Sequence, residues 1–182
     1  PYQEQLLRIG GQLGNRLHEQ GIAWWDTQLK EYQALPAWKD FPAVWEQDTV
    51  RLGGKPEEFP FWLLTARSMQ YSWGSNVGIP LMDEVSKNVR GHHGVIINAG
   101  KAKALGIEEG DLIEVRSALR ATKGQAVLTQ GIRPDTLLML GQFDHWATPY
   151  AKDRETPSMN TLTSMSLELT DATGSIADIV RV

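Results

Sequence analysis

The residues Thr65-Ala66-Arg67 end an apolar stretch and open a loop rich in hydrogen-bonding groups. The Arg67 guanidinium is a planar fork of donors, which suits a phosphate group or the edge of a heterocycle. The loop that follows, residues 68–76, supplies hydroxyl, indole and amide groups, and its Gly74 allows close approach of the backbone to a ligand. We interpret this stretch as a ligand-binding loop, the alternative being a surface arginine that caps the end of a strand.

A second polar stretch, residues 141–158, follows an apolar run and contains Gln142, Phe143 and His145. Irregular segments of this length inside a compact domain are usually functional. For His145, local hydrogen bonding is the more frequent role, because the sequence identifies no partner for proton transfer. Asn160 comes shortly afterwards, and its amide offers one acceptor and two donors that suit the edge of a heterocycle.

The adjacent histidines His92 and His93 invite a metal interpretation. Neighbouring side chains on an extended segment cannot readily bind one metal ion together, and no His-x-x-x-His or carboxylate spacing accompanies them. We therefore expect both histidines in a flexible loop and predict neither a metal ligand nor a catalytic residue in this chain. With no cysteine, the chain supplies no zinc–thiolate site, iron–sulfur ligand or cysteine nucleophile.

The elements that position these groups are clearest in residues 94–117. A β-branched run predicts a buried strand, and Asn98 is a good N-cap for a short helix over Ala99–Leu105. Gly106 and Gly110 stand where positive φ would end the helix and form a turn. The alternating residues 112–117 then predict a half-buried strand. Because so short a helix cannot cover a wide sheet face, we expect it to plug the end of a small barrel.

Further segments predict a mainly β domain. A helix is expected over Ile79–Asn88, with Pro80 tolerated in its first turn. Other short strands are expected at residues 61–65, 125–129, 136–140 and 176–182.

The first 58 residues have a different pattern. We expect their early glycines, at 10, 11 and 14, to interrupt a first helical piece, and Phe41-Pro42 to be extended. Four of the seven tryptophans lie before residue 50 without a regular period. The loop at residues 53–58 sets the expected boundary between an aromatic-rich appendage and linker, 1–58, and a domain, 59–182. The start at Pro1 leads us to expect a fragment of a longer protein.

The central unit contains the pattern Ile-Asn, Ala, Leu-Gly-Ile-Glu-Glu-Gly-Asp-Leu-Ile-Glu-Val over residues 97–115. This pattern resembles the signature of the C-terminal, dinucleotide-binding domain of molybdopterin oxidoreductases of the dimethyl sulfoxide reductase superfamily. Thr65-Ala66-Arg67 is similar to the family's Thr-Gly-Arg, and residues 159–163 are similar to its Ala-Asn-x-Leu-Thr. The resemblance implies a six-stranded double-psi β-barrel of the aspartate-decarboxylase type, mainly β with short helices, preceded by a helical and extended appendage.

The resemblance also implies a cofactor, bis-(molybdopterin guanine dinucleotide) with molybdenum or tungsten, whose metal ligand lies outside this chain. The cofactor-binding residues carried over from the family are Thr65, Ala66, Arg67, Ser68, Tyr71, Ser72, Trp73, Gln142, Phe143, His145 and Asn160. The chain would then be the cofactor-binding fragment of an oxidoreductase catalytic subunit, inactive by itself. Its partners would be the remaining domains of that subunit and an iron–sulfur electron-transfer subunit, in the cytoplasm or periplasm of a prokaryote.

The loop at residues 68–76 and the pair His145-Trp146 are most similar to the branch containing arsenate, polysulfide and phenylacetyl-CoA:acceptor oxidoreductases. Two other functions of a double-psi barrel stay open. One is a self-processing decarboxylase cleaved at Gly74-Ser75 or Gly174-Ser175, and the other is a protein-binding module. The net charge of −4 gives no electrostatic footprint for nucleic acid, and no stretch is apolar enough to predict a membrane span.

Overall fold

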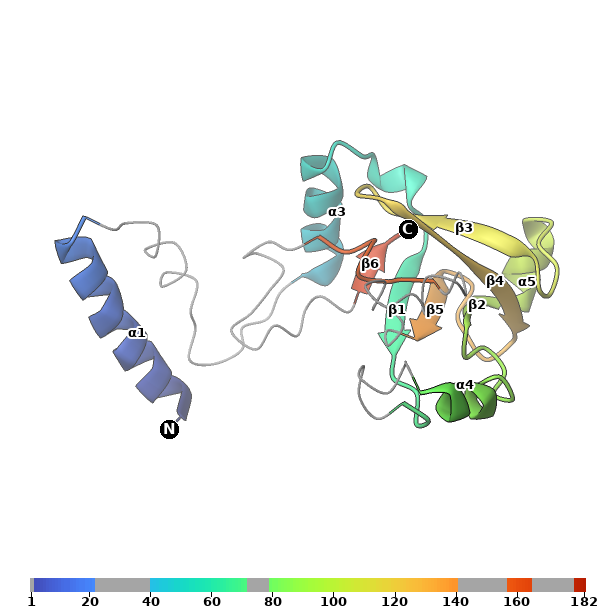
Figure 1. The fold of residues 1–182 in the computed structure, drawn as a ribbon. Helices are drawn as coiled ribbons and strands as arrows, with labels where there is room; N and C mark the ends of the chain where they lie inside the picture. Colours follow the sequence, from blue (N-terminus) through green and yellow to red (C-terminus); the bar gives the residue numbers. More distant parts are fainter. Residues whose placement is uncertain (1, 22–39, 72–78, 141–156, 165–178) are drawn as a thin grey trace. The chain divides into compact units, whose positions relative to one another are not determined.

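The computed structural model describes residues 2–21, 40–71, 79–140, 157–164 and 179–182 (Figure 1). Five predicted cofactor contacts lie outside these residues: Ser72, Trp73, Gln142, Phe143 and His145. Both Gly-Ser pairs also lie outside them. The chain divides into two compact units, one of which includes the residues up to Val44, while the other runs from Trp45 to Ser164 and takes in the C-terminal strand.

The first unit contains helix α1 (Tyr2–Glu19), which is continuous through its three glycines. The expectation that these glycines interrupt it was wrong. A glycine costs a helix about 1 kcal/mol relative to alanine, which weakens the helix without ending it. The helix ends instead before Gly21, whose φ of 78° suits a residue without Cβ. In the described part of the chain, no helix combines the length and apolar character needed to cross a bilayer.

Helix α3 (Phe41–Arg51) begins at Phe41-Pro42, a pair that the sequence predicted to be extended. The Asp40 carboxylate accepts a hydrogen bond from the Ala43 N–H at 3.4 Å and so caps the helix. Pro42 falls in the first turn, where a missing N–H removes no intrahelical hydrogen bond. The expectation for Phe41-Pro42 was therefore wrong, because proline also suits the start of a helix. A short 3₁₀ helix, η1 (Pro56–Glu58), follows.

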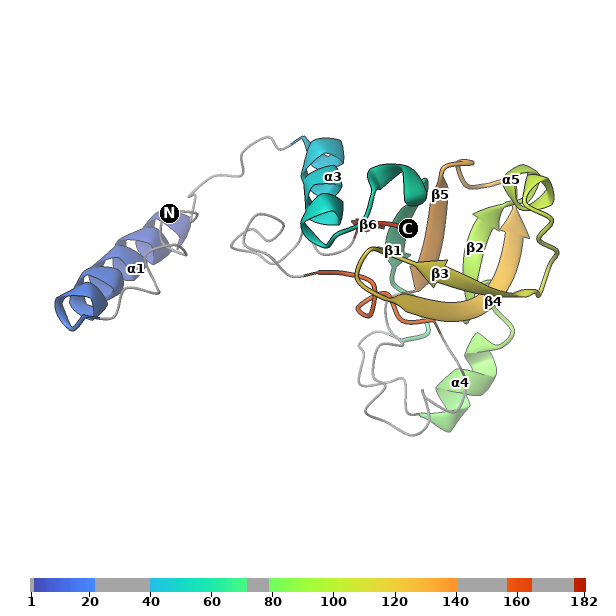
Figure 2. The ribbon, with the colours of Figure 1, turned by 90° about the horizontal axis from the view of Figure 1, so that it is seen from above.

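The second unit is mainly β, as predicted, and its six strands form one mixed sheet that curves into a half-barrel (Figure 2). The strand order is β3-β4-β2-β5-β1-β6. The strands are β1 (Trp62–Ala66), β2 (Gly94–Asn98), β3 (Leu112–Arg116), β4 (Ala121–Thr129), β5 (Thr136–Leu140) and β6 (Ile179–Arg181). The antiparallel pair β2–β5 lies at the centre, and on each side of it comes a parallel neighbour and then an antiparallel one.

The core of the second unit consists of apolar side chains, and each of the six described strands contributes at least one. Its buried members on the strands are Leu63, Val95, Ile97, Val115, Ala126, Leu137, Met139 and Val180. Each large aliphatic side chain buried in this way contributes roughly 1.5–3 kcal/mol through the hydrophobic effect. The burial therefore fixes the register of the short strands, since a shift by one residue would turn these side chains outward.

The central β2–α5–β3 unit confirms the sequence prediction. The Asn98 side chain accepts a hydrogen bond from the Lys101 N–H at 3.1 Å, which caps α5 (Ala99–Ala104). Gly106 and Gly110 have φ values of 72° and 86°. Within α5 the side chain of Ala102 is buried. The helix lies at the end of the sheet opposite to α4 (Pro80–Ser86) (Figure 2). Helix α4 falls within residues 79–88, where the sequence predicted a helix.

The strand register brings several loops to the end of the sheet that carries α4. Ala66 at the end of β1 pairs with Leu140 at the end of β5, and both strands run toward α4 (Figure 1). The antiparallel β2 starts at this same end, where Val95 pairs with Met139. The residues after β1 and those before β2 are therefore neighbours in space, although more than 20 positions separate them in the sequence.

Candidate functional site

The predicted loop after β1 begins where expected. Thr65 and Ala66 are the last two residues of β1, half-buried and paired with Met139 and Leu140 of β5. Arg67 follows directly and is exposed, and its guanidinium has no ion-pair or hydrogen-bond partner among the described residues. The strand end thus presents a cationic fork of donors at the end of the sheet.

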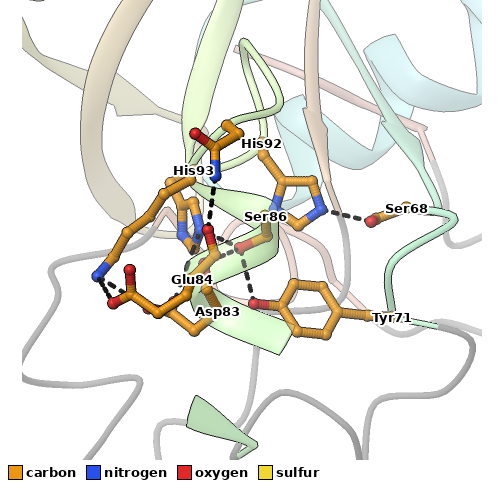
Figure 3. A network of polar contacts seen from close by, with 9 residues as sticks. Ser68, Tyr71, Asp83, Glu84, Ser86, His92 and His93 are labelled. Atoms are coloured by element: carbon orange, nitrogen blue, oxygen red, sulfur yellow. Dashed lines mark hydrogen bonds and ion pairs between the residues drawn. The ribbon is translucent and has the colours of Figure 1, made fainter. Parts of the chain in front are cut away.

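Ser68 forms a small hydrogen-bonded turn after Arg67. Its hydroxyl donates to the Gln70 side-chain oxygen at 2.8 Å and accepts from the Gln70 backbone N–H at 3.1 Å. The same hydroxyl is hydrogen-bonded to Nε2 of His92, in the turn before β2 (Figure 3). One end of the loop is therefore tied to the start of a different strand.

Tyr71 is fully buried at the other end of the described loop, with its ring packed on Met82 and Leu140. Its phenol oxygen lies 2.9 Å from the Ser86 hydroxyl, at the last residue of α4. The Ser86 hydroxyl also donates to the Asp83 backbone carbonyl at 2.8 Å and lies 2.9 Å from Nε2 of His93. Ser86 thereby joins the loop, α4 and the turn before β2 (Figure 3).

A buried carboxylate lies beside this network. Asp83 is 1% exposed, and its Oδ2 lies 3.2 Å from Nζ of Lys87, while its Oδ1 lies 3.8 Å from Nε2 of His93. The Lys87 ammonium also contacts Glu84 at 2.7 Å. A buried charge needs such a partner, because the desolvation of an isolated carboxylate costs far more than its neutralisation. Lys87 therefore provides the countercharge for the buried Asp83 carboxylate.

Both histidines favour the neutral state. Burial, and next the charge of His93, lower the pKa of His92 to about 4. Burial, and next the Lys87 ammonium, lower the pKa of His93 below its usual 6.5, despite the nearby Asp83 carboxylate. At neutral pH both rings are uncharged, so each carries one proton and acts as one donor and one acceptor.

The expectation of a flexible loop for these histidines was wrong. His92 is 2% exposed, and its backbone N–H donates to the Val89 carbonyl at 3.1 Å within a hydrogen-bonded turn. Its ring packs against that of Tyr71, with 5.0 Å between the ring centroids. Ser86 holds His93 and Tyr71 packs on His92. The spacing of residues in the sequence does not reveal such tertiary contacts. Among the described residues, no three His, Cys, Asp or Glu side chains gather as a metal site.

An open pocket of about 560 Å³ adjoins the two histidines. Its lining residues are Lys87, Val89, Arg90, Gly91, His92, His93, Gly94, Gln125 and Val127. The Arg90 guanidinium beside it is held by the Glu109 carboxylate at 3.0 Å and by the Leu128 carbonyl at 2.6 Å. The pocket therefore has a mildly cationic rim and lies next to the network around Ser86.

Asn160 lies in a turn at residues 159–163 and is exposed. The Ser158 N–H donates to the Thr122 hydroxyl at 3.0 Å, and the Ser117 hydroxyl donates to the Leu162 carbonyl at 2.8 Å. These bonds hold the segment against the β3–β4 hairpin. At Gly124, in the same hairpin, an added Cβ would lie 3.0 Å from both Pro157 Cγ and Val95 Cγ2, so Pro157 packs closely on this glycine.

The register places the Asn160 segment at the same end of the sheet as the Arg67 loop. Gln125 of β4 pairs with Gly94 at the start of β2, and Gly124, which packs on Pro157, precedes it. The start of β2 is also the end that Arg67 and Ser68 reach. The predicted residues Thr65, Ala66, Arg67, Ser68 and Tyr71 thus lie at one end of the half-barrel, and Pro157, three residues before Asn160, packs near the same end.

The sequence profile of the molybdopterin dinucleotide binding domain matches residues 61–177, more than half of the chain. The match starts one residue before β1 and therefore includes the Arg67 loop, the network around Ser86 and Asn160. A search of curated proteins finds no match to the chain.

Proposed function

The chain belongs to the molybdopterin dinucleotide binding domain family, and from this premise we propose that it holds bis-(molybdopterin guanine dinucleotide) in a molybdenum or tungsten oxidoreductase. The family binds a molybdopterin dinucleotide, and the guanine form and the metal are our proposal. The observation that carries it is the profile match over residues 61–177, which includes the exposed Arg67 at the end of β1.

The donor set at this end of the half-barrel fits a ligand that is both anionic and heteroaromatic. The Arg67 guanidinium is free of ion-pair partners among the described residues and suits a phosphate group in bidentate geometry. Asn160 is exposed, and its side-chain amide is of the chemical type that hydrogen-bonds the edge of a heterocycle. Thr65, Ala66 and Ser68 adjoin Arg67 in the chain and supply backbone and hydroxyl groups.

When bound, the molybdopterin group supplies the redox chemistry of the parent enzyme. This chain's own residues bind and orient its dinucleotide, and we propose that the metal ligand comes from elsewhere in the catalytic subunit. Ser72, Trp73, Gln142, Phe143 and His145 stay predicted contacts, since they lie outside the described residues.

We further propose that the six strands close into a double-psi barrel. The arrangement of parallel and antiparallel neighbours about the β2–β5 pair is the same on both sides, which supports a fold made of two similar halves. The other domains of the catalytic subunit and an iron–sulfur subunit are the proposed partners. The oxidoreductase branch stays a prediction from the residues of the loop.

The experiment is cofactor stoichiometry in the parent enzyme. Arg67→Ala and Asn160→Ala should each lower its molybdenum or tungsten and pterin content, because loss of a polar contact in a binding site costs roughly 1–3 kcal/mol, or about one to two decades of affinity. Arg116→Ala is the matched control, since Arg116 is an exposed arginine on β3 that pairs only with Glu114 on its own strand among the described residues. Full loading of both site variants would refute the proposed site.

A further inference from the structure

The loop that carries Arg67 is attached at two points to elements that precede β2. Ser68 is tied to His92, and Tyr71 is tied through Ser86 to His93. Tyr71 was predicted as a cofactor contact, yet its side chain is fully buried and packs on Met82 and Leu140. Its surroundings are those of an anchor within the protein.

The protons of this network can be assigned by counting donors and acceptors. The Ser86 hydroxyl has one proton and two lone pairs. Its bond to the Asp83 backbone carbonyl uses the proton, since a carbonyl oxygen only accepts. The phenol of Tyr71 and Nε2 of His93 must therefore both donate to the Ser86 oxygen. A neutral His93 is thereby fixed in the tautomer with its proton on Nε2.

We propose that Ser86 and His93 are positioning residues that hold Tyr71 as the anchor of the dinucleotide-binding loop, so that Arg67 and Ser68 stand ready for the ligand. The inference rests on the proposed function of the chain. A loop held in its binding conformation loses less entropy on binding, which strengthens affinity without a new contact. The Asp83–Lys87 pair lies against His93 and completes the support from α4.

The test is a double-mutant cycle at Tyr71 and Ser86. Ser86→Ala leaves the buried Tyr71 phenol and the His93 Nε2–H without their acceptor, and Tyr71→Phe removes one of the two donors to the Ser86 oxygen. Each should therefore speed pterin loss from the parent holoenzyme by up to about five- to tenfold. The double variant should lose pterin no faster than Ser86→Ala alone, because the phenol that this substitution leaves without an acceptor is then absent. Thr49→Val is the matched control: it removes another buried hydroxyl, one bonded only within α3 in the described part of the chain, and should leave pterin loss unchanged.

A second readout does not depend on the cofactor. In the full 182-residue chain, long-range ¹⁵N NMR should show neutral His93 protonated on Nε2, and Ser86→Ala should release this single tautomer into a mixture. The same substitution should raise the amide exchange rate of Gln70, whose N–H is bonded inside the loop. A His93 proton on Nδ1 in the unmodified chain would overturn the assignment.

The outcomes separate the two proposals. If Arg67→Ala loses cofactor while Tyr71→Phe and Ser86→Ala retain it at the unmodified rate, the anchor is refuted and the binding function stands. If Arg67→Ala and Asn160→Ala retain the cofactor, the proposed site fails, and the NMR and exchange measurements alone decide whether Ser86 and His93 hold the loop. Additive effects in the double-mutant cycle would also refute the anchor.

Discussion

Asp48 in α3 accepts a hydrogen bond at 2.5 Å from the hydroxyl of Ser164, a residue 116 positions later in the chain. Both residues are buried, and the Arg51 guanidinium binds the same Asp48 carboxylate from one helical turn away. The bond joins α3 to the segment that carries Asn160. The C-terminal half of α3 is therefore part of the compact unit that holds the proposed site.

Asp48→Ala should lower the free energy of unfolding by about 1–3 kcal/mol, because it leaves the buried Ser164 hydroxyl without this acceptor. Glu114→Ala, which breaks an exposed pair with Arg116, should change it by no more than about 0.5 kcal/mol. Urea unfolding of the two variants measures the difference. Equal effects would show that the Asp48–Ser164 bond contributes no more than a surface pair.

Two truncated chains test the domain boundary predicted between residues 58 and 59. A chain of residues 41–182 keeps Trp45 and Asp48, whereas a chain of residues 59–182 loses both. Trp45 is only 1% exposed, and removing a buried tryptophan side chain typically costs about 3–5 kcal/mol. The shorter chain should therefore have the lower urea midpoint. Matching midpoints would establish residue 59 as the start of the independently stable domain.

Acid should destabilise the fold before its carboxylates titrate. The pKa of His92 is about 4 in the folded chain and near 6.5 in an unfolded one, so between these values only the unfolded state takes up the proton. Stability is thus complete above pH 6.5 and falls as the pH drops toward 4, by at most about 1.4 kcal/mol per pH unit for one histidine. The groups facing His92 are Ser68, Tyr71 and His93, the last of which also faces Asp83 and Lys87.

His92→Gln removes this titration and keeps a side chain that can hydrogen-bond Ser68. Its unfolding free energy should fall less steeply than that of the unmodified chain between pH 6.5 and 4. His93 contributes a drop of the same sign, since burial also lowers its pKa. Parallel pH profiles for the variant and the unmodified chain would contradict the assignment to His92 of the stability lost between pH 6.5 and 4.

Gly124→Ala should loosen the segment that carries Asn160. An added Cβ would lie 3.0 Å from both Pro157 Cγ and Val95 Cγ2, and overpacking of this kind typically costs about 1–3 kcal/mol. Two of the three closest contacts are to Pro157, so we expect its segment to shift and the Ser158–Thr122 bond next to it to weaken. Amide exchange at Ser158 measures this. Gly131→Ala, where the nearest atom is at 3.5 Å, should leave that rate unchanged.

The elements that the sequence predicted best are those whose signals lie within a few residues. The cap at Asn98 and the turn glycines Gly106 and Gly110 act on their immediate neighbours, so the β2–α5–β3 unit follows from local chemistry alone. The position of Arg67 directly after strand β1 was predictable for the same reason.

Tertiary contacts decide what the sequence did not reveal. Helix α4 buries Asp83 and Ser86 and leaves Leu81 and Val85 exposed at 71% and 47%, the reverse of the usual pattern. No periodicity rule predicts that a serine on an acidic helix will accept from a tyrosine and a histidine outside it. The sequence around His92 likewise predicts an ordinary loop residue. Its contact with Ser68 follows from the pairing of the strands, which the sequence did not reveal.

The strand order has a consequence for how the chain folds during synthesis. The apolar strand β1 emerges before the other strands, yet both of its neighbours, β5 and β6, are among the last to be made. Among the six described strands, only those of the β3–β4 hairpin pair with a strand that directly follows in the sequence. Long-range pairing of this kind is slow, and an unpaired apolar strand is prone to aggregation while it waits. Completion of the sheet therefore waits for β6 at Ile179–Arg181, and β1 lacks both of its neighbours until β5 and β6 have been made.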